Sequence, residues 1–212
     1  MKLMIEQTDY KSLEVISEAA EDGTKTWKIK GPFLESETKN RNGRVYGKDI
    51  IEREVNTYSK DRIATKRAMG ELDHPPTPQI NLDRVSHIIE DLTMDGNSAI
   101  GTAKLLDTPM GKIAQQLLSG GVQLGVSSRG VGSLKGENVG DDYKLICVDI
   151  VGDPSALNAY VDGIYENADY MIDNNQIVER AVENLKKELD SKGSLRVHES
   201  LQRFLKDITN GL

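Results

Sequence analysis

The sequence has one cysteine, three histidines and no long hydrophobic run, and each shortage excludes a class of protein. The lone Cys147 cannot form a disulfide framework or a thiolate metal cage within the chain, as expected of a cytosolic protein. No segment reaches the roughly 18 apolar residues that a membrane-spanning helix needs. The opening residues, Met1–Glu6, turn acidic too early for a secretory signal. We therefore expect a soluble, intracellular protein.

Basic residues are also scarce relative to acidic ones. The 212 residues include 27 Lys and Arg against 34 Asp and Glu, which gives a formal net charge of −7. Phosphate binding needs clustered Lys and Arg, and the short basic run over residues 60–67 is interrupted by Asp61. The sequence therefore argues against a nucleic-acid-binding face, and it gives no sign of a membrane partner.

The length suits a single domain with tails at both ends. We expect an N-terminal tail or propeptide over residues 1–22, with an edge strand as the alternative, a core over residues 23–165 and a C-terminal tail over residues 166–212. Hydrophobic periodicity within the core predicts both strands and helices. The predicted strands lie near residues 24–37, 84–91, 98–106, 122–134 and 143–151, and the predicted helices near 47–60 and 107–119.

Apolar residues recur at helical spacing in the C-terminal tail. Residues 178–189 carry one apolar stripe, and after Gly193 the spacing resumes over residues 197–208. Charged residues fill the other faces, so the predicted helices are amphipathic but have no core of their own. We expect a docking or self-association element, with simple capping of the main domain as the alternative.

The most unusual predicted strand contains Gly125–Gly130, in which Ser127 and Ser128 are adjacent. Strand interiors normally avoid glycine, because it packs nothing and costs backbone entropy. One reason to keep glycine is the close approach of another backbone, such as that of a substrate. A serine hydroxyl could then meet a peptide carbonyl, with nearby backbone N–H groups free to bind an oxyanion. The alternative is a plain bulge or turn.

A nucleophilic serine needs a base, and histidine suits that role near neutral pH. His74 precedes Pro75-Pro76, which holds it in extended geometry at the mouth of a loop. His87 is expected in a strand among apolar neighbours, and His198 on a polar tail. A carboxylate would orient the imidazole. Asp149 lies in an otherwise apolar strand, where it either faces outward or is buried with a partner.

Two other chemistries fit the sequence less well. Glu71, Asp73 and His74 lie within four residues and could suggest a metal site, but no second histidine is nearby. A different serine hydrolase, such as an esterase, would place its serine on a sharp turn between strand and helix. Ser127 is instead followed by more predicted strand. We therefore expect neither a metal nor a cofactor.

Four motifs, in register over roughly residues 24–160, resemble the prohead core protease family of T-even-type tailed bacteriophages. That family is part of a wider group of capsid-maturation serine proteases that includes herpesvirus assemblin. The resemblance implies an α+β fold in which helices surround an antiparallel β-barrel, followed here by the helical tail. The motifs are Asn40–Tyr46, Gly70–Pro76, Gly125–Leu134 and Val148–Ala156.

The resemblance also implies roles for particular residues. His74 would be the base and Ser127 the nucleophile, while the serine after it would point to the opposite face of the strand. Asp149 would be the third member of the triad; assemblin-type enzymes use a second histidine there, which this chain lacks at the matching place. Arg129 and Gly130 would help to stabilise the oxyanion, through backbone N–H groups or an arginine-held water.

Members of this family cut after glutamate and prefer Leu or Ile two residues before it. By resemblance, the substrates would be prohead scaffold or core proteins, the N-terminus of the major capsid protein and the protease itself. Two matches, Ile16-Ser17-Glu18 and Ile177-Val178-Glu179, lie just outside the expected core, so we predict self-cleavage after Glu18 and Glu179. The pattern also occurs at 50–52 and 88–90, inside predicted structure, so accessibility must decide.

The implied location is the interior of the prohead within the host cytoplasm. Self-association through the amphipathic tail is also expected. The main rival interpretation is a non-catalytic, scaffold-binding capsid-assembly factor with the same fold. The discriminating feature is whether His74 and Ser127 lie within hydrogen-bond reach of each other.

Overall fold

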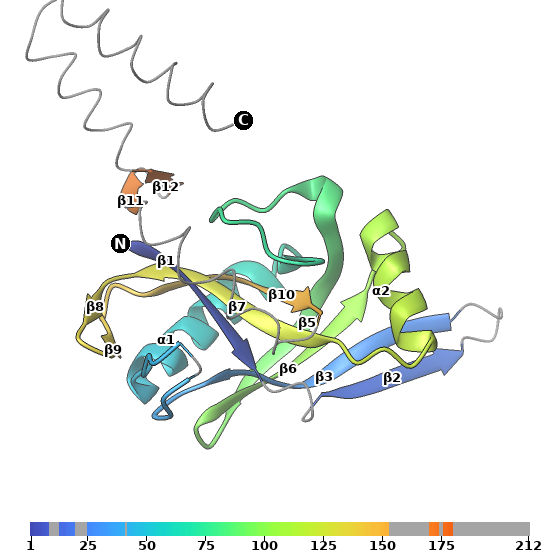
Figure 1. The fold of residues 1–212 in the computed structure, drawn as a ribbon, viewed down its shortest axis with the longest axis horizontal. Helices are drawn as coiled ribbons and strands as arrows, with labels where there is room; N and C mark the ends of the chain where they lie inside the picture. Colours follow the sequence, from blue (N-terminus) through green and yellow to red (C-terminus); the bar gives the residue numbers. More distant parts are fainter. Residues whose placement is uncertain (9–12, 20–24, 41, 153–169, 174–175, 180–212) are drawn as a thin grey trace, which may run out of the picture. The chain divides into compact units, whose positions relative to one another are not determined.

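Two antiparallel sheets hold most of the ordered backbone of this chain (Figure 1). The structure is a computed structural model, and it describes residues 1–8, 13–19, 25–40, 42–152, 170–173 and 176–179. The chain divides into two compact units, Met1–Asn167 and Ala168–Leu212. Both sheets belong to the first unit. In the second unit, the described residues form a hairpin of β11 (Tyr170–Asp173) and β12 (Gln176–Glu179).

The larger sheet contains five strands and forms one side of the core. Its strongest pattern is in β6, where every second residue from Ala99 to Leu105 is buried, as expected when one face of a strand packs inward. Gly101 leaves room for Phe33, because a Cβ atom there would lie 2.2 Å from the Phe33 ring. The strands, in sheet order, are β2 (Glu14–Ala19), β3 (Lys25–Glu35), β6 (Ser98–Leu105), β5 (Val85–Asp95) and β4 (Met69–Glu71).

The smaller sheet contains three strands with the predicted serine strand at its centre. The sheet order is β1 (Lys2–Thr8), β7 (Gly125–Gly132) and β10 (Lys144–Val151). Every residue of β7 is buried, so both faces of this strand are covered by other parts of the protein. A short hairpin of β8 (Leu134–Lys135) and β9 (Asn138–Val139) follows β7.

The two sheets meet at one edge without closing into a barrel. Leu72, just after β4, makes an isolated parallel bridge with Ile150 of β10. The Asp73 amide donates to the Ile150 carbonyl at 2.7 Å. A barrel needs a continuous ladder around its circumference, whereas β1 and β2 are edge strands of the described sheets. The expected closed barrel is therefore wrong for the part of the chain that the structure describes.

Two α-helices are present among the described residues, close to where the sequence predicts them. Helix α1 (Lys48–Tyr58) buries one face, which includes Ile51 and Val55, and it runs into a π-helical turn, η2 (Ser59–Ile63). Helix α2 (Pro109–Ser119) starts at Thr108, whose Oγ1 accepts from the Gly111 amide at 3.1 Å. A 3-10 turn, η3 (Leu82–Arg84), precedes β5. Within the described residues, two α-helices are too few to surround the sheets, which is a second departure from the expected fold.

The two ends of the chain compare differently with the sequence-based expectation. In residues 1–22, of which the structure describes 1–8 and 13–19, the edge-strand alternative is the one observed, because β1 and β2 pair with β7 and β3. The consecutive apolar residues Leu3, Met4 and Ile5 are buried, because both faces of β1 are covered. Val178 lies in strand β12, where a helical stripe was expected. Residues 180–212, with His198, lie outside the described residues.

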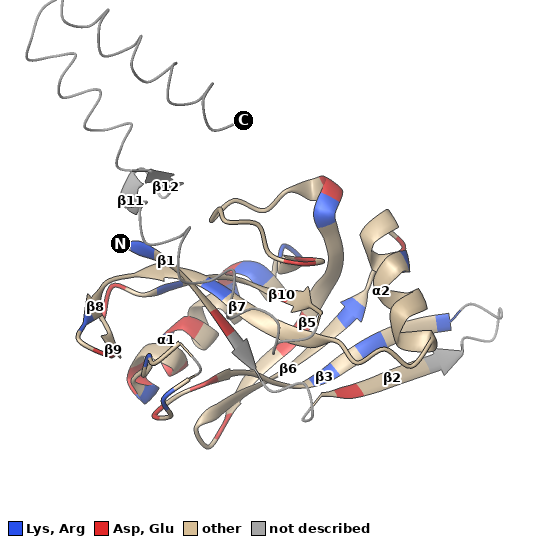
Figure 2. Ribbon diagram, viewed as in Figure 1, with Lys and Arg blue, Asp and Glu red and all other residues tan. Residues whose placement is uncertain are grey.

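Charge is mixed over the fold. Figure 2 shows acidic and basic residues interspersed along the same strands and helices, which agrees with a net charge of only −7 over 212 residues. Among the described residues, no helix is both long enough and apolar enough to cross a membrane.

Candidate active site

The register of β7 and β10 gathers four polar residues on one face of the smaller sheet. Ser127 pairs with Asp149, and Arg129 pairs with Cys147. Paired residues in antiparallel strands point to the same face, and so do residues two apart in one strand. We call this the Ser127 face. All four of its residues are fully buried. Ser128 points to the opposite face, as the sequence predicts.

His74 reaches this region through the short link between β4 and β10. The residue before it, Asp73, has a left-handed φ of 60° and binds the Ile150 carbonyl through its amide. The Asp73 Oδ1 atom also accepts the His74 amide at 3.0 Å. His74 is 7% exposed, and the charges of Asp149 and Arg129 both act on its imidazole. The chain thus brings His74 close to the residue that pairs with Ser127.

The imidazole of His74 is held in its neutral form. Burial lowers its pKa below the ordinary value of 6.5, because a buried cation loses its hydration. The carboxylates of Asp149 and Asp73 act in the opposite direction, and Arg129 lowers the pKa further. A neutral imidazole can accept a proton, which is what a general base requires.

Ser127 and His74 also share an unusual lack of partners. Within the described part of the chain, neither the Ser127 Oγ atom nor either ring nitrogen of His74 makes a hydrogen bond. Leaving a buried polar atom unpaired costs about 1–3 kcal/mol. The two side chains are therefore available to a substrate, although they do not hydrogen-bond to each other in this state.

Asp149 is fixed by several donors at once. Its Oδ1 atom accepts from the Glu71 amide at 3.0 Å, from Arg129 Nη2 at 3.2 Å and from the Cys147 thiol at 3.4 Å. Its Oδ2 atom forms an ion pair with Arg129 Nε at 3.0 Å. Of the two alternatives left open by the sequence, Asp149 is therefore the buried residue with a partner.

Arg129 is the organising cation of the Ser127 face. Its guanidinium is fully buried between Asp149 and Glu71, with Nη2 at 3.2 Å from Glu71 Oε2. Nη1 donates to the carbonyls of Thr77 at 2.7 Å and Gln79 at 3.1 Å. Every guanidinium nitrogen thus contacts a protein oxygen. This arrangement gives no support to an arginine-held water at the oxyanion, and the backbone N–H alternative stays a prediction.

Gly130 has a packing reason to be glycine. A Cβ atom at this position would lie 2.5 Å from the Tyr143 side chain. Gly130 is also paired on both sides, with Met4 of β1 and Leu145 of β10. Its amide therefore lies in a strand with a neighbour on each side.

Sequence reasoning overlooked the importance of Glu71. Its Oε1 atom accepts from the Asn81 amide in a very short hydrogen bond, and burial raises the pKa of its carboxyl group. Its side chain is directed to Arg129 rather than toward His74 and Asp73, with which the sequence had grouped it as a weak metal candidate. Glu71 lies in the Gly70–Pro76 motif, so the sequence could have indicated that Glu71 is near the site. It could not have indicated that Arg129 is its partner.

His87 is a core histidine, as the sequence suggested. Its Nε2 atom lies 2.9 Å from the Val148 carbonyl and its Nδ1 atom 2.9 Å from Ser86 Oγ. These contacts place the ring proton on Nε2, where it binds the strand that carries Asp149. Gly70 permits this approach, because a Cβ atom there would lie 2.3 Å from His87 Nε2.

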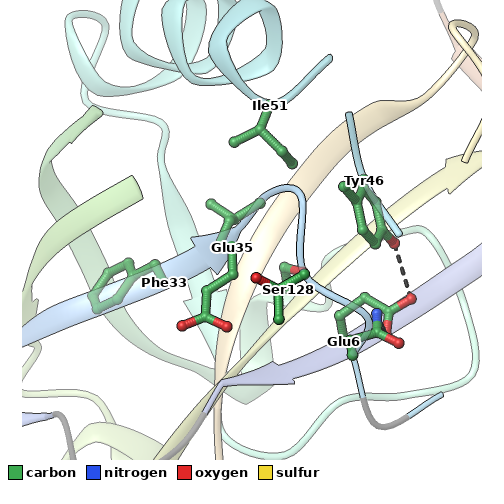
Figure 3. Close-up of a pocket in the computed structure, with 9 residues that line it drawn as sticks. Glu6, Phe33, Glu35, Tyr46, Ile51 and Ser128 are labelled. Carbon is green, nitrogen blue, oxygen red and sulfur yellow. Dashed lines mark hydrogen bonds between the residues drawn. The ribbon is translucent and has the colours of Figure 1, made fainter. Parts of the chain in front are cut away.

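A pocket lies on the opposite side of β7, against Ser128. Figure 3 shows Glu6 and Tyr46 joined by a hydrogen bond beside Ser128, with Phe33, Glu35 and Ile51 around them. The pocket is partly open to solvent and has a cavity volume of about 30 Å³. Because Ser128 lines it and Ser127 does not, this pocket belongs to the other face of the strand.

Comparison with known proteins decides the family. Residues 5–169 match the prohead core protein serine protease family. The chain belongs to that family. The range that matches this prohead protease family includes the four motifs of this chain on which the sequence resemblance rests. Ser127, His74 and Asp149 all lie within the matched range.

Two relatives show how far the likeness extends. The chain is 39% identical over 142 residues to the prohead core protein protease of Enterobacteria phage T4. That match covers 63% of this chain and 66% of the relative, slightly less than two thirds of its length. A solved structure of the bacteriophage T4 capsid assembly protease superimposes with a TM-score of 0.66 at 33% identity. It covers 72% of this chain and 98% of that protein.

Proposed function

We propose that this chain is a serine endopeptidase that cleaves prohead proteins during capsid maturation. The observation that carries the proposal is the pairing of Ser127 with Asp149, next to a buried, neutral His74. Family membership adds the chemical class.

In the proposed mechanism, His74 accepts the Ser127 proton as the Oγ atom attacks the scissile carbonyl carbon. The carbonyl π electrons move to oxygen, and the tetrahedral intermediate collapses when His74 returns the proton to the leaving amine. Water then attacks the acyl-enzyme with His74 again acting as base. This reaction sequence releases the acid product and restores Ser127.

Asp149 stabilises the imidazolium that forms in each step. An ionised carboxylate offers about four lone-pair sites. Asp149 can therefore accept a His74 N–H while it keeps its contacts to Arg129 and the Glu71 amide. The oxyanion would be bound by backbone N–H groups around Arg129 and Gly130. These residues lie between β1 and β10, so an oxyanion site there requires one of the two ladders to open.

The proposed specificity is cleavage after glutamate in (Leu/Ile)-x-Glu segments. Proposed substrates are scaffold or core proteins, the N-terminus of the major capsid protein and the chain itself, inside the prohead. Glu18 lies in β2, an edge strand, and Glu179 is the last residue of β12. Cleavage after Glu18 therefore requires an edge strand to detach from β3.

A non-catalytic assembly factor is the second candidate. It is favoured by one observation: no hydrogen bond joins Ser127 to His74 in the part of the chain that the structure describes. The two candidates differ in whether Ser127 performs chemistry. They make the same prediction for the fold.

The test is cleavage of a peptide that contains Ile-x-Glu by the wild-type chain, by Ser127→Ala and by the matched control Ser128→Ala. We expect Ser127→Ala to reduce kcat/KM by about 10³-fold or more, because loss of a catalytic nucleophile has effects of at least this size. Ser128→Ala should retain activity within about tenfold, since Ser128 lies on the other face. No cleavage by any of the three proteins, either before or after tail trimming, would favour the assembly factor. Equal loss in both variants of an active wild type would instead count against Ser127 as the nucleophile.

A further inference from the structure

The Asn40–Tyr46 motif has no role in the proposed chemistry. Four of its side chains contact the carboxylate of Glu6. Tyr46 OH and Arg44 Nη1 each lie 2.9 Å from Glu6 Oε1. Asn40 Nδ2 and Asn42 Nδ2 donate to Glu6 Oε2 at 2.6 and 2.8 Å. These four side chains, which we call the carboxylate cradle, all come from one short loop.

The loop has hydrogen bonds of its own that define the cradle. Asn40 Oδ1 accepts from the amides of Asn42 at 3.0 Å and Arg44 at 2.9 Å. The Asn40 amide donates to the Arg44 carbonyl at 2.9 Å, and Gly43 takes a left-handed φ of 76° at the turn. None of these bonds involves β1. The donors are therefore arranged by the loop itself rather than by Glu6.

The carboxylate cradle also contacts the backbone of β1, the strand that carries Glu6. Asn42 Nδ2 donates to the Ile5 carbonyl at 2.8 Å as well as to Glu6. Tyr46 OH lies 3.8 Å from Met4 Sδ, two residues before Glu6. The loop thus recognises an extended segment with a glutamate and, two residues earlier, a large apolar side chain.

That segment runs directly beside the proposed nucleophile. In the pairing of β1 with β7, Glu6 lies opposite Ser128 and Gln7 lies opposite Ser127. The peptide bond after Glu6 therefore lies next to the Ser127 position. Met4-Ile5-Glu6 departs from the (Leu/Ile)-x-Glu pattern only by Met in place of Leu or Ile. Strand β1 resembles a substrate in its extended backbone, its glutamate and its apolar residue.

We propose that the cradle of Asn40, Asn42, Arg44 and Tyr46 is the receptor for the glutamate of a substrate strand, and that β1 occupies it as an internal stand-in. The proposal rests on the proposed peptidase function and names the regulation of the same site. A peptide gains access when β1 leaves, and it then adds to β7 by main-chain pairing, a common mode of peptide recognition. Glu6, Asn40 and Tyr46 of this region also line the pocket described above, in which Figure 3 shows Glu6 and Tyr46 side by side.

The chemistry of the cradle favours glutamate over glutamine. All four side-chain groups act as donors toward the Glu6 oxygens, and Arg44 adds a positive charge. A glutamine amide would direct N–H groups at some of these donors and lose the ion pair. Specificity of this kind comes from unpaired donors left by the wrong ligand.

The test measures binding without turnover. Fluorescein-labelled Lys-Leu-Met-Ile-Glu-Gln-Thr, the sequence of β1, and the same peptide with Gln in place of Glu are titrated into the full chain carrying Ser127→Ala. In fluorescence anisotropy, we expect Glu6→Ala added to Ser127→Ala to tighten binding of the Glu peptide by about tenfold or more, a change of about 1.4 kcal/mol. The Gln peptide should bind this protein about tenfold more weakly, and adding Arg44→Gln should abolish the difference. Glu90→Ala, which removes an exposed carboxylate, should change neither affinity.

The alternative is that Glu6 only anchors β1. In that case the Glu and Gln peptides would bind equally, or neither would bind, and either result overturns the proposal. Glu6→Gln is a milder variant to use if Glu6→Ala unfolds; unfolding of both at 25 °C would also show a purely structural role. Because Ser127 is absent throughout, these outcomes do not depend on catalysis. Failure of every Ser127-containing form to cleave would instead count against the peptidase.

Discussion

Each face of β7 lies against a carboxylate, and the two carboxylates differ in burial and in the residues around them. On the Ser127 face, Asp149 and Arg129 form an ion pair in which both side chains are fully buried. On the Ser128 face, Glu6 and Arg44 form an ion pair whose side chains are 10% and 15% exposed. The Glu6 carboxylate has a donor for each oxygen from side chains of one loop. The Ser127 face leaves Ser127 and His74 without hydrogen bonds in the described chain.

On the Ser127 face, buried polar groups lack hydrogen bonds within the described residues, whereas on the Ser128 face every oxygen of the Glu6 carboxylate has donors. Unpaired buried groups cost free energy, so a protein keeps them where they meet a reactant. A carboxylate with four side-chain donors is a recognition arrangement, since every bond is already made in the folded state. Under the two proposals, one strand carries chemistry on one face and recognition on the other.

The comparison predicts that Arg129 matters more for stability than Arg44. Arg129→Met leaves two buried carboxylates, Asp149 and Glu71, without their cation, and breaking a buried pair in this way costs about 3–5 kcal/mol. Arg44→Met should cost less, because Glu6 keeps three other donors and some contact with water. Urea denaturation of both variants measures the two free energies of unfolding. Equal losses would show that the two ion pairs are energetically alike.

The next prediction concerns the close contact of Gly70 in β4 with Val148 in β10 and with His87. In Gly70→Ala, the new Cβ would lie 2.2 Å from the Val148 carbonyl oxygen, a backbone atom, and 2.3 Å from His87 Nε2. Overpacking of this kind costs about 1–3 kcal/mol. The matched control is Gly152→Ala, where a Cβ would meet nothing within 4 Å. Thermal unfolding should separate the two variants, and an unchanged Gly70→Ala protein would mean that β4 can move away from β10.

The Ser127 face should also respond to pH through His74. Because burial lowers the His74 pKa, its neutral form persists below pH 6.5, and the acid limb of kcat/KM should have its midpoint below that value. The unfolded chain binds this proton more readily than the fold. His74 therefore contributes stability that is complete above pH 6.5 and is lost as pH falls toward the lowered pKa.

The pH–rate profile of peptide cleavage measures this midpoint. Asp73→Asn keeps an oxygen for the His74 amide but removes a charge that raises the His74 pKa, so it should move the acid limb to lower pH. A wild-type midpoint at or above 6.5 would contradict a lowered pKa of His74. An unchanged midpoint in Asp73→Asn would mean that Asp73 is screened by water.

The sequence predicts the strands and helices of the core well, because their signals are local. The alternation that predicts β6 and the Thr108-Pro109 helix start both depend on neighbours in the chain. Sheet closure does not, and the barrel was wrong because pairing between β4 and β10 is limited to one bridge. Consecutive apolar residues hid β1, since a strand buried on both faces shows no period of two.

The candidate site follows the same division. Ser127, His74 and Asp149 could be proposed from residue type and motif order. The partner of Arg129 could not, because Glu71 and Asp149 are 58 and 20 residues away in sequence and meet it only in the folded protein. The carboxylate cradle was equally hidden. Asn-Gly sequences such as Asn42-Gly43 favour tight turns, but nothing local indicates that this turn faces Glu6.

The smallest predicted effect compares two buried tyrosine hydroxyls. Tyr46 OH donates to Glu6, whereas Tyr58 OH has no hydrogen-bond partner among the described residues. Charged groups that act on Tyr58 include Asp149 and Arg129 of the Ser127 face. Tyr46→Phe removes a bond to a charged group and should cost about 1.5–3 kcal/mol at most, with less if Arg44 and the two asparagines compensate. Tyr58→Phe removes an unsatisfied group and should be neutral or stabilising, because no bond is lost. Urea denaturation of the two variants would contradict the contrast between the faces if Tyr58→Phe proved the more destabilising.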